Sequence, residues 1–290
     1  MRPDHLLDEG TMRALARRRL TVRRAYSGLP GAHPAPRSGL SLEFADYRPY
    51  QPGDDFRLID WAVYARHRRL VTKLFTHEAE VPLYLLVDTS RSMGEGKASK
   101  LAFARRLAAA LAYVAFRGQD RFGVYWFSEQ VDGGIPARRG RPQLAAVLEA
   151  LAGLTAAGAT DLAAALRSWA QGGHERGLAV VVSDFLQPDG AERGVAALHA
   201  ARHQVVAVQV LAREDLAPRS AGEVHLVDVE RGHGRDLVLA PRTLRAYQQA
   251  LRAFTDQLAS FCLSRQVAYR LSAADGEPVE TVLGLLARRR

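Results

Sequence analysis

Strand and helix signals alternate along this chain from about residue 81 onward, and this alternation limits the possible fold more than any other feature. Short apolar runs rich in branched side chains are typical of buried strands. Such runs occupy 81–87, 121–127, 178–182 and 204–211. Apolar residues at helical spacing follow the first run, at Leu101, Ala104, Ala108, Leu111 and Ala115. Repeated alternation predicts an α/β fold, with a doubly wound, mainly parallel sheet covered by helices on both faces.

The remaining elements follow from the same patterns. We expect further helices at 142–152, 161–171, 190–202, 241–264 and 278–287, and further strands at 223–229 and 266–271. The strand at 121–127 is expected to turn at Asp132-Gly133-Gly134 into a hairpin partner, because glycine favours the tight turns of hairpins.

The first 79 residues differ in composition from the rest and predict an N-terminal extension. We therefore expect an arm at 1–79 and an α/β domain with C-terminal helices at 80–290. Within the arm, a basic helix is expected at 4–19 and a glycine- and proline-rich loop at 28–39. The stretch 44–61 mixes acids, arginines and aromatic residues without a helical or strand period, and predicts an ordered loop with Pro-Gly turns.

Two interpretations of the stretch 44–61 remain open. Its acids and arginines would form an ion-pair network that anchors the arm to the sheet, which is the interpretation that we favour. Alternatively, these charged residues form a recognition surface or a reactive carboxylate pair.

The chain has an excess of positive charge, with 40 Lys and Arg against 31 Asp and Glu and a formal net charge of +9. A nucleic-acid-binding protein gathers such an excess into one stripe with aromatic residues interleaved. Here the arginines are spread over separate clusters at 17–19, 66–69, 138–141 and 288–290. Nucleic-acid binding through the arginine excess is therefore an alternative that we do not favour.

The sequence carries no sign of a membrane segment or of a disulfide. No uncharged apolar run approaches the roughly 20 residues that span a bilayer, and the N-terminus lacks the apolar segment of a secretory signal. Cys262 is the single cysteine, which excludes an internal disulfide and a cysteine-rich metal site. We expect a cytoplasmic protein.

Three loops, each at the end of a predicted strand or the start of a predicted helix, are rich in oxygen-bearing side chains. Ligands of open α/β sheets bind where such loops gather, at the carboxyl ends of the strands. Carboxylates and hydroxyls without His or Cys suit a hard divalent cation, which we expect to be Mg²⁺, with Mn²⁺ or Ca²⁺ as substitutes. The predicted metal ligands are Asp88, Ser90, Ser92, Thr160 and Asp184.

Each of these residues also has a purely structural interpretation. Ser90 or Ser92 would cap the following helix, and Thr160 would cap the helix that begins near Asp161. Asp184 would be a turn residue at the end of a strand. We favour the metal site because all three loops carry suitable side chains.

The five predicted ligands resemble the metal-ion-dependent adhesion site of a von Willebrand factor type A domain. A longer segment upstream is similar to the signature of the domain-of-unknown-function fifty-eight family, which lies just before such a domain. This segment reads Phe44-x-Asp46-x-Arg48-x-Tyr50-x-x-Gly53-Asp54-Asp55-x-Arg57-x-Ile59-Asp60-Trp61, then Ala65-Arg66 and Glu78. The similarity continues through Ser183-Asp184-Phe185 and His203-x-Val205 and covers roughly residues 37–285.

The resemblance implies a binding module rather than an enzyme. In type A domains the protein supplies an incomplete metal shell, and a carboxylate of the partner completes it. Members of the family typically accompany MoxR-type AAA+ ATPases and are linked to maturation or assembly of other proteins. The implied partner is therefore such an ATPase, which donates an acidic side chain to the metal. Many relatives carry membrane segments upstream of the signature, and none is expected here.

A Mg²⁺-dependent hydrolase or phosphotransferase with Asp88 as the nucleophile is the main alternative. Aspartate-nucleophile phosphatases of the haloacid dehalogenase type have a second carboxylate two residues further on, where this chain has Ser90. The sequence also lacks a Gly-x-x-x-x-Gly-Lys-Ser/Thr phosphate loop and a Gly-x-Ser-x-Gly elbow. We therefore expect no enzymatic activity.

Overall fold

The computed structural model describes residues 6–16, 18, 42–77, 81–94, 99–187, 189–216, 222–227 and 234–286. Contacts divide the chain into two compact units. The sheet unit comprises Met1–Val22 and Val81–Arg290, and the small unit comprises Arg23–Glu80. The expected boundary between residues 79 and 80 lies close to the observed one, but the first 22 residues join the sheet unit rather than an arm.

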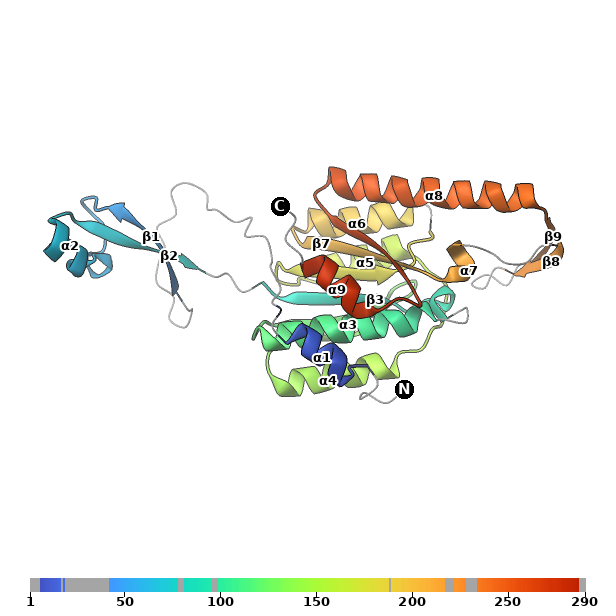
Figure 1. The fold of residues 1–290 in the computed structure, drawn as a ribbon, viewed down its shortest axis with the longest axis horizontal. Helices are drawn as coiled ribbons and strands as arrows, with labels where there is room; N and C mark the ends of the chain where they lie inside the picture. Colours follow the sequence, from blue (N-terminus) through green and yellow to red (C-terminus); the bar gives the residue numbers. More distant parts are fainter. Residues whose placement is uncertain are drawn as a thin grey trace. The chain divides into compact units, whose positions relative to one another are not determined.

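The sheet unit is built on six strands in the order β10-β7-β6-β3-β4-β5 (Figure 1). In chain order these strands are β3 (Leu83–Asp88), β4 (Phe122–Phe127), β5 (Val131–Arg138), β6 (Leu178–Ser183), β7 (Gln204–Leu211) and β10 (Ala268–Ala273). Every neighbouring pair is parallel except β4 and β5, which are antiparallel. The predicted mainly parallel sheet of an α/β fold is confirmed.

Helices cover both faces of this sheet because alternate strand residues point to opposite sides. Leu83, Leu85 and Val87 of β3 belong to one core cluster, and Tyr84 and Leu86 to the other. The first cluster contains residues of α1 (Glu9–Leu15), α3 (Lys100–Arg117), α4 (Arg141–Gly153) and α9 (Pro278–Leu286). The second contains residues of α5 (Leu162–Gln171), α6 (Gly190–Ala200) and α8 (Pro241–Ser264). No helix among the described residues is long and apolar enough to cross a membrane.

The N-terminal helix α1 is shorter than the predicted helix at 4–19 and packs on the sheet unit. Asp8 caps it by accepting a hydrogen bond from the Thr11 N–H. Leu6, Leu7 and Leu15 are buried in the first core cluster. This burial explains why the start of the chain belongs to the sheet unit.

The predicted turn at Asp132-Gly133-Gly134 is wrong, because these residues lie within strand β5. The chain reverses earlier, where the Ser128 N–H donates to the Gln130 carbonyl. Gly133 and Gly134 pair with Trp126 and Tyr125 of β4. A Cβ at either glycine would lie 2.3 Å from the Trp126 ring or 2.1 Å from the Tyr125 ring. These glycines therefore make room for two aromatic rings rather than forming a turn.

The strand predicted at 223–229 does not join the main sheet. It is β8 (Gly222–Val227), which pairs in antiparallel fashion with β9 (Gly234–Leu239) in a separate two-stranded sheet. Residues 228 and 229 lie outside the described residues. The position next to β7 is taken by β10 instead. A short helix that was not predicted, α7 (Arg213–Leu216), follows β7.

The small unit contains regular structure where the sequence predicts a loop. Its elements are β1 (Leu42–Pro49), the 3-10 helix η2 (Phe56–Leu58), α2 (Trp61–His67) and β2 (Val71–His77). The strands β1 and β2 are antiparallel, with a bulge between Phe44 and Asp46. A bulge adds one residue and interrupts the alternation of side chains along a strand. This explains why the sequence of β1 shows no strand period. The loop predicted at 28–39 and Glu78 of the signature lie outside the described residues.

Acids and bases pair within the small unit. Asp60 caps α2 by accepting the Ala62 and Val63 N–H groups, accepts the Tyr47 hydroxyl at 2.8 Å and pairs with Lys73 at 3.2 Å. These contacts, the Tyr47 hydrogen bond first, lower the pKa of Asp60 to about 2. The described contacts of Asp60 thus lie within this unit and stabilise its own helix, while the expected anchoring of the arm to the large sheet stays a prediction.

We predict that Gly134→Ala destabilises the protein by about 1–3 kcal/mol, because the added Cβ overlaps the Tyr125 ring. Gly153→Ala is the matched control, since a Cβ there meets nothing within 4 Å and alanine is the better helix former. Urea denaturation of both variants measures the two free energies of unfolding. Equal stability of the Gly134→Ala variant and the wild type would contradict the observed register of β4 and β5.

Candidate functional site

The site lies at the carboxyl edge of two neighbouring parallel strands. Strand β3 ends at Asp88 and strand β6 ends at Ser183, directly before Asp184. The strands are in register, with Val87 opposite Val182. Both aspartates are consequently carried to the same edge of the sheet, where open α/β folds bind their ligands, and both are buried.

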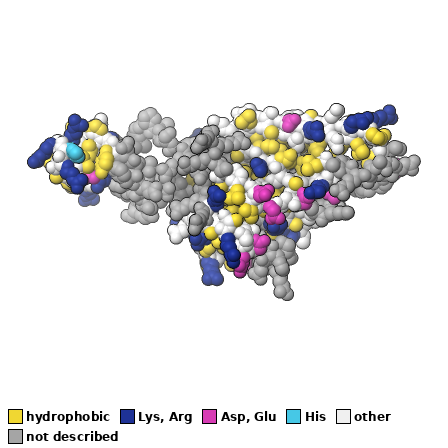
Figure 2. Space-filling view, viewed as in Figure 1, with side chains coloured by type: hydrophobic (Ala, Val, Ile, Leu, Met, Phe, Trp, Pro, Cys, Tyr) yellow, Lys and Arg dark blue, Asp and Glu magenta, His cyan; other side chains and the backbone are white. Residues whose placement is uncertain are grey.

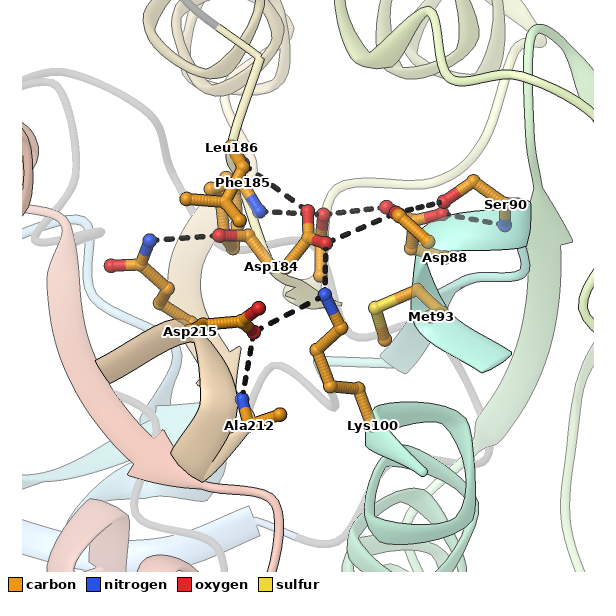
Figure 3. A network of polar contacts seen from close by, with 12 residues as sticks. Asp88, Ser90, Met93, Lys100, Asp184, Phe185, Leu186, Ala212 and Asp215 are labelled. Atoms are coloured by element: carbon orange, nitrogen blue, oxygen red, sulfur yellow. Dashed lines mark hydrogen bonds and ion pairs between the residues drawn. The ribbon is translucent and has the colours of Figure 1, made fainter. Parts of the chain in front are cut away.

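Both carboxylate oxygens of Asp88 accept hydrogen bonds from the protein (Figure 3). The Ser90 N–H donates to Oδ1 at 2.9 Å, and the Ser183 hydroxyl donates to Oδ2 at 2.6 Å. Asp88 has no exposed surface. The orientation of its side chain is therefore fixed by both loops.

A chain of hydroxyls joins Asp88 to Asp184. The Ser90 and Ser92 hydroxyl oxygens lie 3.2 Å apart, and the Ser92 hydroxyl donates to Asp184 Oδ2 at 3.0 Å. The Leu186 N–H donates to Asp184 Oδ1 at 3.2 Å. Four of the five predicted ligands thus form one hydrogen-bonded group: Asp88, Ser90, Ser92 and Asp184.

The loop that carries Thr160 lies beside the loop that follows β3. The Arg91 N–H donates to the Gly158 carbonyl at 2.9 Å, and the Ala157 N–H donates to the Thr89 carbonyl at 2.8 Å. The carbonyl oxygen of Thr160 accepts from the Gln187 side chain at 3.2 Å. All three predicted loops therefore meet at one edge of the sheet.

Other residues provide the helix caps that the structural interpretation assigned to the predicted ligands. Ser99 caps α3 by accepting from the Ala102 N–H, and Asp161 caps α5 by accepting from the Ala164 N–H. The Ser90 and Ser92 hydroxyls instead contact each other and Asp184.

A buried lysine, which sequence reasoning missed, completes the group. Lys100 is the first residue of α3 and only 4% exposed. Its Nζ lies 2.6 Å from Asp184 Oδ2 and 3.5 Å from Asp215 Oδ2. The one sequence signal for Lys100 was that lysine is rare in this chain. Of the 40 Lys and Arg residues, lysine occurs only at 73, 97 and 100.

A second layer of polar groups supports the backbone around Asp184. The Gln209 side chain of β7 donates to the Asp184 carbonyl at 2.7 Å, and the Tyr269 hydroxyl of β10 donates to Gln209 Oε1 at 2.5 Å. Phe185 has a φ of 55°, in the left-handed region that bulky residues rarely adopt. Backbone strain of this kind gathers at functional sites, and here it directly follows Asp184.

The charges of this group are unbalanced in the absence of a cation. Burial, followed by repulsion from Asp184, raises the pKa of Asp88 from 3.8 to about 7. Burial also disfavours the charge of Lys100, but attraction by Asp184 and Asp215 outweighs it and raises the pKa of the ammonium. With all groups ionised, the site holds the three carboxylates of Asp88, Asp184 and Asp215 and one ammonium, which leaves an excess of two negative charges.

The donor chemistry fits a hard divalent cation. The ligands on offer are carboxylate and hydroxyl oxygens, which Mg²⁺ prefers, and a divalent cation would match the excess of two negative charges. Among the residues that the structure describes, no group of three His, Cys, Asp or Glu is placed to hold a metal. A cation bound here would therefore depend on the serine and threonine hydroxyls and on water.

We predict that Asp88 makes the metal-free protein less stable as the pH rises from about 4 to about 7. The folded pKa of Asp88 lies above its unfolded value, so the folded state binds more protons in this window and loses stability as they dissociate. The free energy of unfolding of the wild type minus that of Asp88→Asn should fall from pH 5 to pH 8 in EDTA. A difference that stays constant with pH would contradict the raised pKa.

Comparison with known proteins identifies relatives along most of the chain. Residues 46–256 match the family described as "Protein of unknown function DUF58". An uncharacterized protein of Mycobacterium bovis is 34% identical over 246 residues, which cover 83% of this chain and 77% of that protein. An uncharacterized protein of Mycobacterium tuberculosis matches with the same identity and coverage.

Two solved structures are also similar. An aerotolerance-related membrane protein from Bacteroides fragilis aligns with a TM-score of 0.46 and 16% identity, over 71% of this chain and 96% of that one. The conserved hypothetical protein BatB from Bacteroides thetaiotaomicron aligns with a TM-score of 0.45 and 16% identity, over 71% of this chain and 97% of that one. The match over residues 46–256 and the mycobacterial relatives show that this chain belongs to the DUF58 family.

Proposed function

We propose that this protein is a metal-dependent protein-binding module with an adhesion site of the von Willebrand factor type A kind. The proposed ligands of Mg²⁺, or of Mn²⁺ or Ca²⁺ in its place, are Asp88, Ser90, Ser92, Thr160 and Asp184. The observation that carries the proposal is the buried group in which two aspartates are joined through two serine hydroxyls at 3.0–3.2 Å. An excess of negative charge in a buried site favours a bound cation.

The composition of the ligand set favours recognition of an acidic partner. Hydroxyl ligands carry no charge, so two carboxylates neutralise a divalent cation without filling its coordination shell. A bound cation would supply an open position for a carboxylate oxygen of a partner protein. The chain's own residues fix the orientation of this position, because Ser183 and the Ser90 N–H hold Asp88 in place.

Binding rather than catalysis suits the environment of Asp88. Catalysis with Asp88 as the nucleophile would need a group that protonates the leaving group, whereas the hydrogen bonds described for Asp88 come from the Ser90 N–H and the Ser183 hydroxyl. Two positions further on, where haloacid dehalogenase-type phosphatases have their second carboxylate, Ser90 supplies no carboxyl proton. A hydrolase or phosphotransferase is therefore the weaker proposal.

The proposed partner is a MoxR-type AAA+ ATPase that contributes an acidic side chain, and the proposed role is that of an adaptor in maturation or assembly of other proteins. This part rests on membership of the DUF58 family and on the resemblance of the site to an adhesion site. Nucleic acid is the less favoured partner, because Lys and Arg side chains on the face shown in Figure 2 lie in several separate groups rather than in one stripe.

We predict that Mg²⁺ binds the wild-type protein and that Asp88→Asn weakens this binding on the order of tenfold or more, because a ligand charge is lost. The matched control is Asp256→Asn, which makes the same chemical change at an exposed position of α8. Isothermal titration calorimetry measures the affinity of each protein, and circular dichroism verifies that each is folded.

The partner is tested with a purified MoxR-type ATPase from the same organism. Binding to the wild type in Mg²⁺, with loss of binding in EDTA and in Asp88→Asn, is the expected result. Folded wild-type protein that binds neither Mg²⁺ nor Mn²⁺ would contradict the proposed site. Partner binding that is equally strong in Mg²⁺, in EDTA and with Asp88→Asn would contradict the proposed mode of recognition.

A further inference from the structure

Lys100 is the one buried cation described in this site, and the proposed metal ligands do not account for it. Lysine is almost never fully buried unless it is paired. Lys100 is 4% exposed, whereas the side chain of Lys73 in the small unit is 38% exposed. Its position at the start of α3 directs the ammonium into the hydrogen-bonded group of the two aspartates (Figure 3).

The ammonium contacts an oxygen that a metal in this site would need. Lys100 Nζ donates to Asp184 Oδ2 at 2.6 Å, and the Ser92 hydroxyl donates to the same oxygen at 3.0 Å. A divalent cation held by Ser92 and Asp184 would lie within a few ångströms of the ammonium. Two positive charges at that distance in a buried site repel strongly.

A second carboxylate lies within reach of the same ammonium. Asp215 Oδ2 is 3.5 Å from Lys100 Nζ, and the Ala212 N–H donates to that oxygen at 2.9 Å. The Asp215 side chain is 27% exposed, against 6% for Asp184. In Figure 3 dashed lines join the lysine ammonium to both aspartates. A small rotation about the side-chain bonds would therefore exchange one partner for the other.

We propose that Lys100 is a tethered counter-ion that sets the metal affinity of this site. Its ammonium neutralises Asp184 while no metal is bound and moves toward Asp215 when a divalent cation takes its place beside Asp184. The inference rests on the proposed function, because it concerns the same metal site.

Under this arrangement the charges of the site balance fully only when the metal is bound. Without metal, Lys100 compensates part of the negative charge that two buried aspartates would otherwise leave unpaired. With metal, Asp88 and Asp184 match the two charges of the cation, and Asp215 matches Lys100. Displacement of the ammonium costs free energy, so the wild type should bind metal weakly in the absence of a partner carboxylate.

The test is the affinity of Mg²⁺ for Lys100→Met, which retains the length of the side chain and removes its charge. We expect this affinity to exceed that of the wild type on the order of tenfold or more, since one nearby positive charge is lost. Lys73→Met is the matched control, because it makes the same change in the small unit, and it should leave the affinity unchanged. Calorimetry gives the affinities, and the Mg²⁺-induced shift in Tm gives an independent measure.

The outcomes separate this inference from the proposed function. Measurable Mg²⁺ binding by the wild type and tighter binding by Lys100→Met support the inference. Binding by the wild type with equal or weaker affinity in Lys100→Met overturns the inference and leaves the metal site standing. Failure of all three proteins to bind Mg²⁺ overturns both.

Asp215→Asn tests the second position of the ammonium without removing the lysine. This variant should weaken Mg²⁺ binding several-fold on its own, because Lys100 loses its alternative partner, and should have a much smaller effect in the Lys100→Met background. Such coupling is what a double-mutant cycle measures. Equal effects of Asp215→Asn in both backgrounds would show that Asp215 acts only through its own charge and would overturn the proposed movement.

Discussion

Asp88 and Asp184 repel each other in a buried environment where an isolated charge is costly, and much of the surrounding structure accommodates this repulsion. The parallel register of β3 and β6 brings the two side chains to one edge of the sheet. Hydrogen bonds from Ser183 and Ser92 and the ion pair with Lys100 offset part of the cost. Replacement of such a group by apolar side chains often leaves a protein equally or more stable, so the presence of these charges agrees with the proposed binding function.

The supports of this group come from elements that are far apart in the sequence. Ser99 caps α3 and thereby fixes the start of the helix, one residue before Lys100. Gln209 on β7 donates to the Asp184 carbonyl, and Tyr269 on β10 donates to Gln209. The strained backbone at Phe185 is kept in place by burial of its ring and by the hydrogen bond from its N–H to Ser183. Rigid support of this kind gives a binding site a defined orientation before its partner arrives.

Sequence patterns predicted the sheet and the loops of the site because both depend on local signals. Buried parallel strands read as apolar runs, and their carboxyl ends mark the loops that hold Asp88 and Asp184. The patterns failed where long-range contacts decide the structure. Gly133 and Gly134 were assigned to a turn, although the rings of Tyr125 and Trp126 explain them. The bulge in β1 concealed its alternation. A lysine in a predicted helix is expected to face solvent, and only the folded chain shows that the Lys100 ammonium is buried against Asp184.

The most direct test of the central claim is a crystal structure of the protein soaked with Mn²⁺, with anomalous scattering used to locate the ion. We predict an anomalous peak between Asp88 and Asp184, at about 2.0–2.4 Å from the Ser90 and Ser92 hydroxyl oxygens, with Lys100 Nζ closer to Asp215 than to Asp184. A well-ordered crystal without a peak at this edge of the sheet, with Lys100 still bound to Asp184, would contradict the claim that these residues form a metal-dependent binding site.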